Sequence, residues 1–228
     1  MFNFSLVSTS LRKKFAVSFL LMAFLTATTS WAADNNYKTF QTLFTWIDFK
    51  PMFIVENIGG QQKDIDNSAL KALPEDWQQT VVKWGKSPYK SIAAFHINKV
   101  LDGFLVLGPS ELNGSNINLL VFDQTGHLQG NEMLTSFSGD EGNYYMKYCW
   151  LKDINGDGHL DLLFREQGET MTDDGKQECS SDHISVKLWD GKSFAWWDIP
   201  EKKEANLKKE TRHDLLNIKN ACNKGASS

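Results

Sequence analysis

The sequence predicts a mostly β fold in which antiparallel sheets form a propeller-like body or a sandwich, with a short internal helix and a C-terminal helix. Three observations support this fold class. Apolar runs alternate with turn residues from Ile92 to Trp197, which is the pattern of successive strands. One of these strand patterns occurs twice. Apolar residues recur at helical spacing in two further segments, within residues 74–84 and 201–223.

The duplicated strand pattern indicates an internal repeat. Residues 117–123 read Ile-x-Leu-x-Val-Phe-Asp, and residues 184–190 read Ile-x-Val-x-Leu-Trp-Asp. A glycine turn follows each copy, at Gly126 and Gly191, and another apolar segment follows each turn. Upstream, the Asp-Gly-Phe-Leu of residues 102–105 aligns with the Asp-Gly-His-Leu of residues 157–160. Two such units imply stacked or radially arranged antiparallel sheets.

Two segments are predicted to be helical. Pro74 suits a first helical position, acidic residues follow it, and Gly85 suits the position after a helix that ends at Trp84. The segment from Glu201 to Asn223 lacks Gly and Pro. Its apolar stripe predicts a helix docked on the body, with members at Leu207, Thr211, Leu215, Ile218 and Cys222.

The N-terminus has the layout of a bacterial export signal. Three basic residues, 12–14, precede the apolar run Phe15–Leu25, and Ser30-Trp31-Ala32 offers small residues for cleavage after Ala32. An eleven-residue helix spans about 16 Å, which is too short for a bilayer core of about 30 Å, so we expect no membrane span. The predicted divisions are a signal peptide at 1–32, a β domain at 33–200, and a helix and tail at 201–228. The expected location is periplasmic or secreted.

Charge restricts the partners of this chain. The 228 residues carry a formal charge of −4, and without the first 32 residues 21 basic residues oppose 28 acidic ones, a net charge of −7. An acidic surface of this kind disfavours nucleic acid. It suits a cation or a basic protein partner.

The stretch Asp153–Asp161 carries the strongest chemical signal. It reads Asp-Ile-Asn-Gly-Asp-Gly-His-Leu-Asp, so oxygen side chains recur at alternate positions around a glycine bend. Calcium takes about six to eight oxygen ligands, and a tight loop can present them. The predicted ligands are the side chains of Asp153, Asn155, Asp157 and Asp161 and the carbonyl oxygen of His159. An EF-hand has Glu at its twelfth position, where this chain has Phe164, and the alternation after Leu160 favours a loop between strands.

The order Trp-Leu-Lys-Asp-x-Asn-x-Asp-Gly-x-x-Asp-Leu-Leu over residues 150–163 resembles the FG-GAP or VCBS repeat. That resemblance implies calcium and β structure and no particular activity. Together with the export signal, the acidic mature chain and the tail helix, the loop also resembles periplasmic calcium-binding proteins that act as lysozyme inhibitors or immunity proteins. This second resemblance implies a partner that degrades the cell wall.

The remaining polar and aromatic features predict two surface elements. Residues 168–183 are expected to form a polar insertion between strands. In the pair Trp196-Trp197, one indole is expected in the core and the other as an exposed anchor, because successive strand residues face opposite ways.

Of three cysteines, Cys179 and Cys222 are the favoured disulfide, with Cys149–Cys179 as the alternative.

No motif for a nucleophilic serine, a metalloprotease or a phosphate loop is present in the sequence, and the five histidines lack ligand spacing. The first hypothesis is therefore a non-enzymatic, calcium-stabilised protein that binds a protein partner, with oligomeric state left open. A hydrolase of envelope polymers with structural calcium is the second hypothesis, and an adhesion or complex-assembly module is the third.

Overall fold

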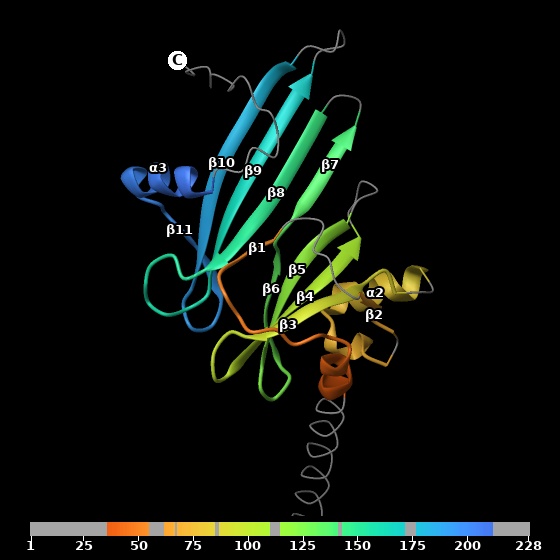
Figure 1. Ribbon diagram of the computed structural model, residues 1–228. Coiled ribbons are helices and arrows are strands. Elements are labelled where there is room, and N and C mark those ends of the chain that lie inside the picture. Colours follow the sequence, from red (N-terminus) through yellow and green to blue (C-terminus); the bar gives the residue numbers. More distant parts are fainter. Residues whose placement is uncertain are drawn as a thin grey trace, which may run out of the picture.

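The computed structural model describes residues 36–54, 62–66, 68–84, 87–109, 115–140, 143–171 and 177–211. The described chain is mostly β and contains two antiparallel sheets (Figure 1). Sheet A has the strand order β2-β3-β4-β5-β6. Its strands are β2 (Lys63–Asp64), β3 (Lys90–His96), β4 (Leu101–Pro109), β5 (Ser115–Asp123) and β6 (Leu128–Met133).

Sheet B has the order β1-β8-β9-β10-β11, and β7 also pairs with β8. The short strands β1 and β7 share one edge of β8, because β7 pairs with residues 143–147 and β1 pairs with residues 149–151. The strands are β1 (Met52–Ile54), β7 (Ser136–Asp140), β8 (Asn143–Lys152), β9 (Asp161–Met171), β10 (Gln177–Trp189) and β11 (Phe194–Trp197).

The internal repeat corresponds to one four-stranded meander in each sheet. Strands β3 to β6 follow one another in sheet A, and β8 to β11 do so in sheet B. The two copies of the duplicated pattern fall in β5 and β10, the third strand of each meander. The prediction of mostly β structure with antiparallel sheets is thereby confirmed. The described strands form two sheets rather than a ring of blades, so the propeller-like alternative is not confirmed.

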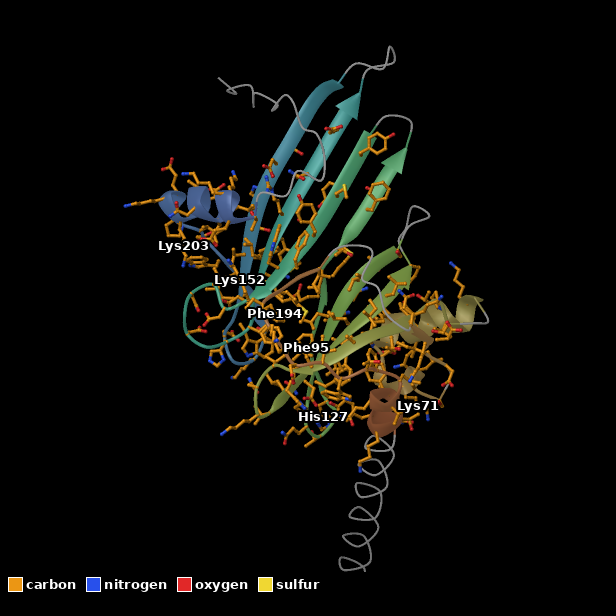
Figure 2. The ribbon with its side chains drawn as sticks, viewed as in Figure 1. Lys71, Phe95, His127, Lys152, Phe194 and Lys203 are labelled. Carbon is orange, nitrogen blue, oxygen red and sulfur yellow. The ribbon has the colours of Figure 1, made fainter. Side chains whose placement is uncertain are left out.

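A shared apolar core joins the two sheets. Phe95 and Leu119 of sheet A belong to the same buried cluster as Phe164 and Trp189 of sheet B. Phe194, at the end of β11, packs against this cluster, and Figure 2 shows it close to Phe95 between the sheets. Beyond this core, β7 to β10 continue past the end of sheet A (Figure 1).

Helices cover the outer face of sheet A. Residues 36–42 are helical, and η1 (Leu70–Ala72) and α2 (Glu75–Trp84) lie on the same side as this segment. The predicted internal helix is therefore present, and Trp77 stacks on Tyr89 with ring centroids 4.5 Å apart. Because both faces of sheet A are covered, β4 and β5 are apolar almost throughout instead of alternating.

The predicted C-terminal helix is present but shorter than expected in the described chain. Helix α3 spans Glu201–Glu210 and packs through Leu207 on Leu163, Ile184 and Val186 of sheet B. It ends at Thr211, whose backbone N–H caps the carbonyl of Leu207. The remainder of the predicted helix, residues 212–223, lies outside the described residues, as does the predicted signal peptide.

The predicted polar insertion at 168–183 is wrong in the part that the structure describes. There β9 continues to Met171, and β10 begins at Gln177. Polar side chains are tolerated in these strands because the hairpin projects beyond sheet A. Trp196 is exposed and Trp197 is half-buried beside α3, so the predicted opposite orientation of the two indoles is confirmed, and the role of Trp196 as an anchor stays a prediction.

The alternative disulfide Cys149–Cys179 is also wrong. Cys149 is a buried free thiol. In the sheet, Cys149 lies opposite Phe164 of β9 and Cys179 lies opposite Thr170 of β9, and these two β9 residues are about 20 Å apart along the strand. A disulfide requires Cα atoms within about 7 Å of each other. The favoured pairing involves residue 222, which lies outside the described residues.

None of the described helices combines the length and the apolar composition that crossing a bilayer requires.

Candidate metal centre

The acidic loop joins two neighbouring strands of sheet B. Strand β8 ends at Lys152 and β9 begins at Asp161, and these two residues pair across the hairpin. The loop therefore lies between strands, as the sequence predicts, and no helix follows it. In Figure 1 it lies at the lower end of β8 and β9, on the side of α3.

Three side chains fold the loop by accepting hydrogen bonds from its own backbone. Asp153 accepts from the N–H groups of Gly156 and Gly158, at 2.7 and 2.9 Å. The Asn155 side-chain oxygen accepts from the Asp157 N–H, and Asp157 Oδ1 accepts from the His159 N–H. Hydrogen bonds from Asn155 and His159 hold the pKa of Asp157 below its ordinary value.

The tight curl depends on the two glycines of the loop. Gly156 and Gly158 have φ angles of +84° and +83°, in the left-handed region that disfavours residues with a Cβ. Their conformation brings both N–H groups toward the carboxylate of Asp153. The backbone of the loop therefore curls around the side chain of Asp153.

Asp161 differs from the other acidic residues of the loop because it is fully buried. Its two oxygens accept hydrogen bonds from the backbone N–H groups of Ile154, at 2.9 Å, and Trp189, at 3.1 Å. Burial raises the pKa of Asp161 above its ordinary value of 3.8, and backbone hydrogen bonds offset only part of this effect. The carboxylate joins the loop to the end of β10.

No Lys, Arg or His side chain in the described chain forms an ion pair with Asp161. Lys152 is directly opposite in the hairpin, but its Nζ lies 2.9 Å from a carboxylate oxygen of Glu210 in α3. Lys203 of α3 donates to the backbone oxygen of Ile154 at 3.2 Å. Figure 2 shows Lys152 and Lys203 on the side of the loop that faces α3. The helix is thus attached to the loop while the buried carboxylate keeps its charge uncompensated.

The donors of this loop match calcium in kind. They are carboxylate, amide and carbonyl oxygens, which hard cations prefer, and each oxygen that accepts one N–H retains a second lone pair. The positions of these oxygens, however, do not form a metal site. Among the described residues, no three His, Cys, Asp or Glu side chains gather closely enough to hold a metal ion, and the three aspartates of the loop are no exception. Binding of calcium would therefore require the side chains of Asp153 and Asp157 to move toward Asp161.

The sequence did not reveal a second polar cluster on the outer side of sheet A. Asp102 is buried and accepts from the Tyr37 hydroxyl at 3.1 Å, and its other oxygen lies 2.7 Å from His96 Nδ1. The exposed His96 ring stacks on Trp46, with centroids 4.6 Å apart. Only the hairpin pairing of His96 with Asp102 could have indicated this cluster, and that pairing becomes visible once the turn at 97–100 is located.

In comparisons with known proteins, no family model, no curated protein and no solved structure matches the chain significantly. The function is therefore argued from the loop, the sheets and the distribution of charge.

Proposed function

We propose that this chain is an exported β protein of FG-GAP or VCBS-like type, stabilised by calcium, which binds a basic protein partner. The observation that carries the calcium part is the buried, uncompensated carboxylate of Asp161. Its folded-state pKa lies above the unfolded value of 3.8, so stability falls as the pH rises through that interval. At neutral pH the ionised group therefore destabilises the fold, and a bound cation would remove this cost.

Calcium would be held by the side chains of Asp153, Asn155, Asp157 and Asp161 and by the carbonyl oxygen of His159. The ion would supply positive charge at the hairpin end, where the loop meets both β10 and α3. Its role would be structural, since Asp161 connects the loop to Trp189 and Lys203 connects the loop to α3. Free calcium outside the cytosol is sufficient for a site with a dissociation constant of about 10⁻⁴ to 10⁻³ M.

Thermal unfolding with calcium and with chelator tests this proposal. If the dissociation constant is about 10⁻⁴ M, about 10 mM calcium stabilises the folded state by about 2.7 kcal/mol. Asp157→Ala should abolish most of this calcium-dependent shift. The matched control is Asp190→Ala, because Asp190 accepts two N–H groups in the β10–β11 turn and belongs to no ligand set. An unchanged melting curve, or equal calcium shifts in both variants, would contradict calcium binding.

The partner part of the proposal rests on the net charge of −7 and on the resemblance to inhibitors of cell-wall-degrading enzymes. An acidic inhibitor would be attracted to a basic enzyme, and the association rate would fall steeply with ionic strength. A pull-down from periplasmic extract, with and without chelator, tests this expectation. A stoichiometric basic protein supports the proposal. Turnover of cell-wall material by the purified protein would instead support the hydrolase hypothesis.

Export is tested separately. Protein isolated from the periplasm or the medium should begin at residue 33, as determined by N-terminal sequencing. Recovery of the uncleaved chain in the cytosol would contradict the proposed location.

A further inference from the structure

The inner face of sheet B, meaning the face that carries the core shared with sheet A, remains partly exposed where β7 to β10 extend past sheet A (Figure 1). Two aromatic side chains of the inner face are exposed, one in the projecting part of β8 and one in β11 beside sheet A. Trp196 of β11 is 63% exposed, and Tyr145 of β8 is 37% exposed. Both rings lie on the inner face, because paired residues of neighbouring strands share a face and alternate residues of one strand face the same way. Trp196 pairs with Lys187, whose side chain contacts sheet A, and Tyr145 pairs with Gly168, two residues from Glu166 in β9.

A continuous row of contacts connects the two rings. Trp196 lies 6.0 Å from the buried ring of Phe164, and the Nζ of Lys147 lies 4.3 Å from the centre of that same ring. Lys147 lies 3.7 Å from the carboxylate of Glu166, and burial together with the charge of Glu166 raises the pKa of Tyr145. We call this row, from Trp196 to Tyr145, the inner ribbon.

Lys187 extends the inner ribbon toward sheet A. Its Nζ lies 4.6 Å from the centre of the Trp196 ring and 2.6 Å from a carboxylate oxygen of Glu132 in β6. The inner ribbon with this extension thus contains two lysines and two glutamates in ion pairs. Its net charge is zero, although the mature chain is acidic.

This pattern disfavours three kinds of macromolecule. A protein interface has a central region depleted of charge, whereas the centre of this surface consists of charged side chains. Nucleic acid requires an excess of basic residues. An extended peptide adds a strand at an open sheet edge, whereas the row from Trp196 to Tyr145 crosses the face of β8 and β9, which are paired on both sides.

A neutral sugar polymer has the complementary chemistry. Its hydroxyl groups both donate and accept, so they can bond to lysine ammonium groups and glutamate oxygens without altering the charge balance. Its ring C–H groups are weakly positive and are attracted to the negative faces of aromatic rings. The Cα atoms of Trp196 and Tyr145 are about 24 Å apart by strand geometry, which requires several sugar units.

We propose that the inner ribbon binds a neutral, extended oligosaccharide, which stacks on Trp196 and Tyr145 and bonds to Lys147, Glu166 and Lys187. This inference uses no residue of the calcium loop, and its test uses sugars rather than calcium or a protein partner.

The test is calorimetric titration of the purified full chain with an N-acetylglucosamine hexamer and with cellohexaose. At least one of them should bind, with a dissociation constant that changes less than about twofold between 0.05 and 0.5 M salt, since the ligand carries no charge. Trp196→Ala should weaken binding by about tenfold or more, since exposed aromatic anchors contribute strongly to affinity.

The matched control is Tyr144→Ala. Tyr144 is 42% exposed and adjacent to Tyr145, but it lies on the opposite face of β8. The control should retain wild-type affinity, whereas Tyr145→Ala should weaken it. Circular dichroism should show wild-type folding in all three variants. Absence of binding by both sugars at up to about 5 mM, or equal losses in Tyr144→Ala and Tyr145→Ala, would overturn the proposal. So would loss of a captured protein partner in Trp196→Ala without any sugar binding.

Discussion

Replacement of Asp182 by Ala should destabilise the fold strongly, because Asp182 forms an ion pair with a buried arginine. Asp182 of β10 accepts two hydrogen bonds from Arg165 of β9, from Nε at 2.7 Å and from Nη2 at 2.8 Å. Arg165 is buried, and its Nη1 donates to the carbonyl oxygen of Thr211, the residue that ends α3. The pair therefore connects two strands to the docked helix.

The magnitude follows from the different exposure of the two partners. Removal of the carboxylate takes a charged hydrogen-bond partner away from a buried guanidinium. Breaking a buried pair typically costs about 3–5 kcal/mol, and the partial exposure of Asp182 places the expected value at about 3 kcal/mol. Hydrogen bonds from Arg165 lower the pKa of Asp182 below 3.8. The stabilisation is thus complete above the unfolded value of 3.8 and is lost as the pH falls through the folded-state pKa.

Urea unfolding followed by tryptophan fluorescence measures this difference. At pH 7 Asp182→Ala should lower the free energy of unfolding by about 3 kcal/mol, and the difference from wild type should narrow as the pH falls from about 4 toward 2. Asp198→Ala is the control, since it removes the same charge from an exposed residue after β11. Similar losses in both variants, or a loss that does not change with pH, would refute the reasoning.

Three further outcomes can be measured in the same way. Leu207→Ala should lower the free energy of unfolding by about 2–3 kcal/mol, because Leu207 is the buried contact of α3, and urea midpoints would show it. Gly103→Ala should lower the free energy of unfolding by about 2 kcal/mol, since the added Cβ would lie 2.7 Å from the buried Phe95 ring. Gly130→Ala is its control, because the Cβ added there would have no neighbouring atom closer than 3.8 Å and should not clash. Cys149 should react with a thiol reagent only after unfolding, because burial raises the pKa of its thiol; rapid labelling of the native protein would contradict its position in the core.

The strands that bury side chains could be predicted from the sequence, and the projecting ones could not. Apolar runs mark β4 and β5 because both faces of sheet A are covered. The far parts of β9 and β10 extend past the core, so their residues are polar and resemble a loop. Their strand structure comes from pairing with each other over ten residue pairs, which is a property of two segments together.

The calcium hypothesis shows the same division between local and distant information. Spacing within nine residues was enough to place the loop between two strands and to nominate its oxygen donors. The burial of Asp161 was not predictable, because it depends on the N–H of Trp189, which is 28 residues away. The contact of Lys203 with the loop also depends on the docking of α3 on sheet B.

The two meanders explain why an ion would be needed in only one of them. Each buries an aspartate near the start of its second strand, Asp102 in β4 and Asp161 in β9. This structural correspondence differs from the sequence alignment, which placed Asp102 opposite Asp157. Asp102 accepts a hydrogen bond from the Tyr37 hydroxyl and lies 2.7 Å from His96 Nδ1, and both partners come from sheet A and its covering helix. Within the described chain Asp161 accepts hydrogen bonds only from backbone N–H groups, and the longer loop before it carries the additional oxygens that a cation would require. A buried carboxylate that pairs with no basic side chain in the described chain therefore occurs in the same copy as a lengthened acidic loop, as expected if a bound cation stabilises that carboxylate.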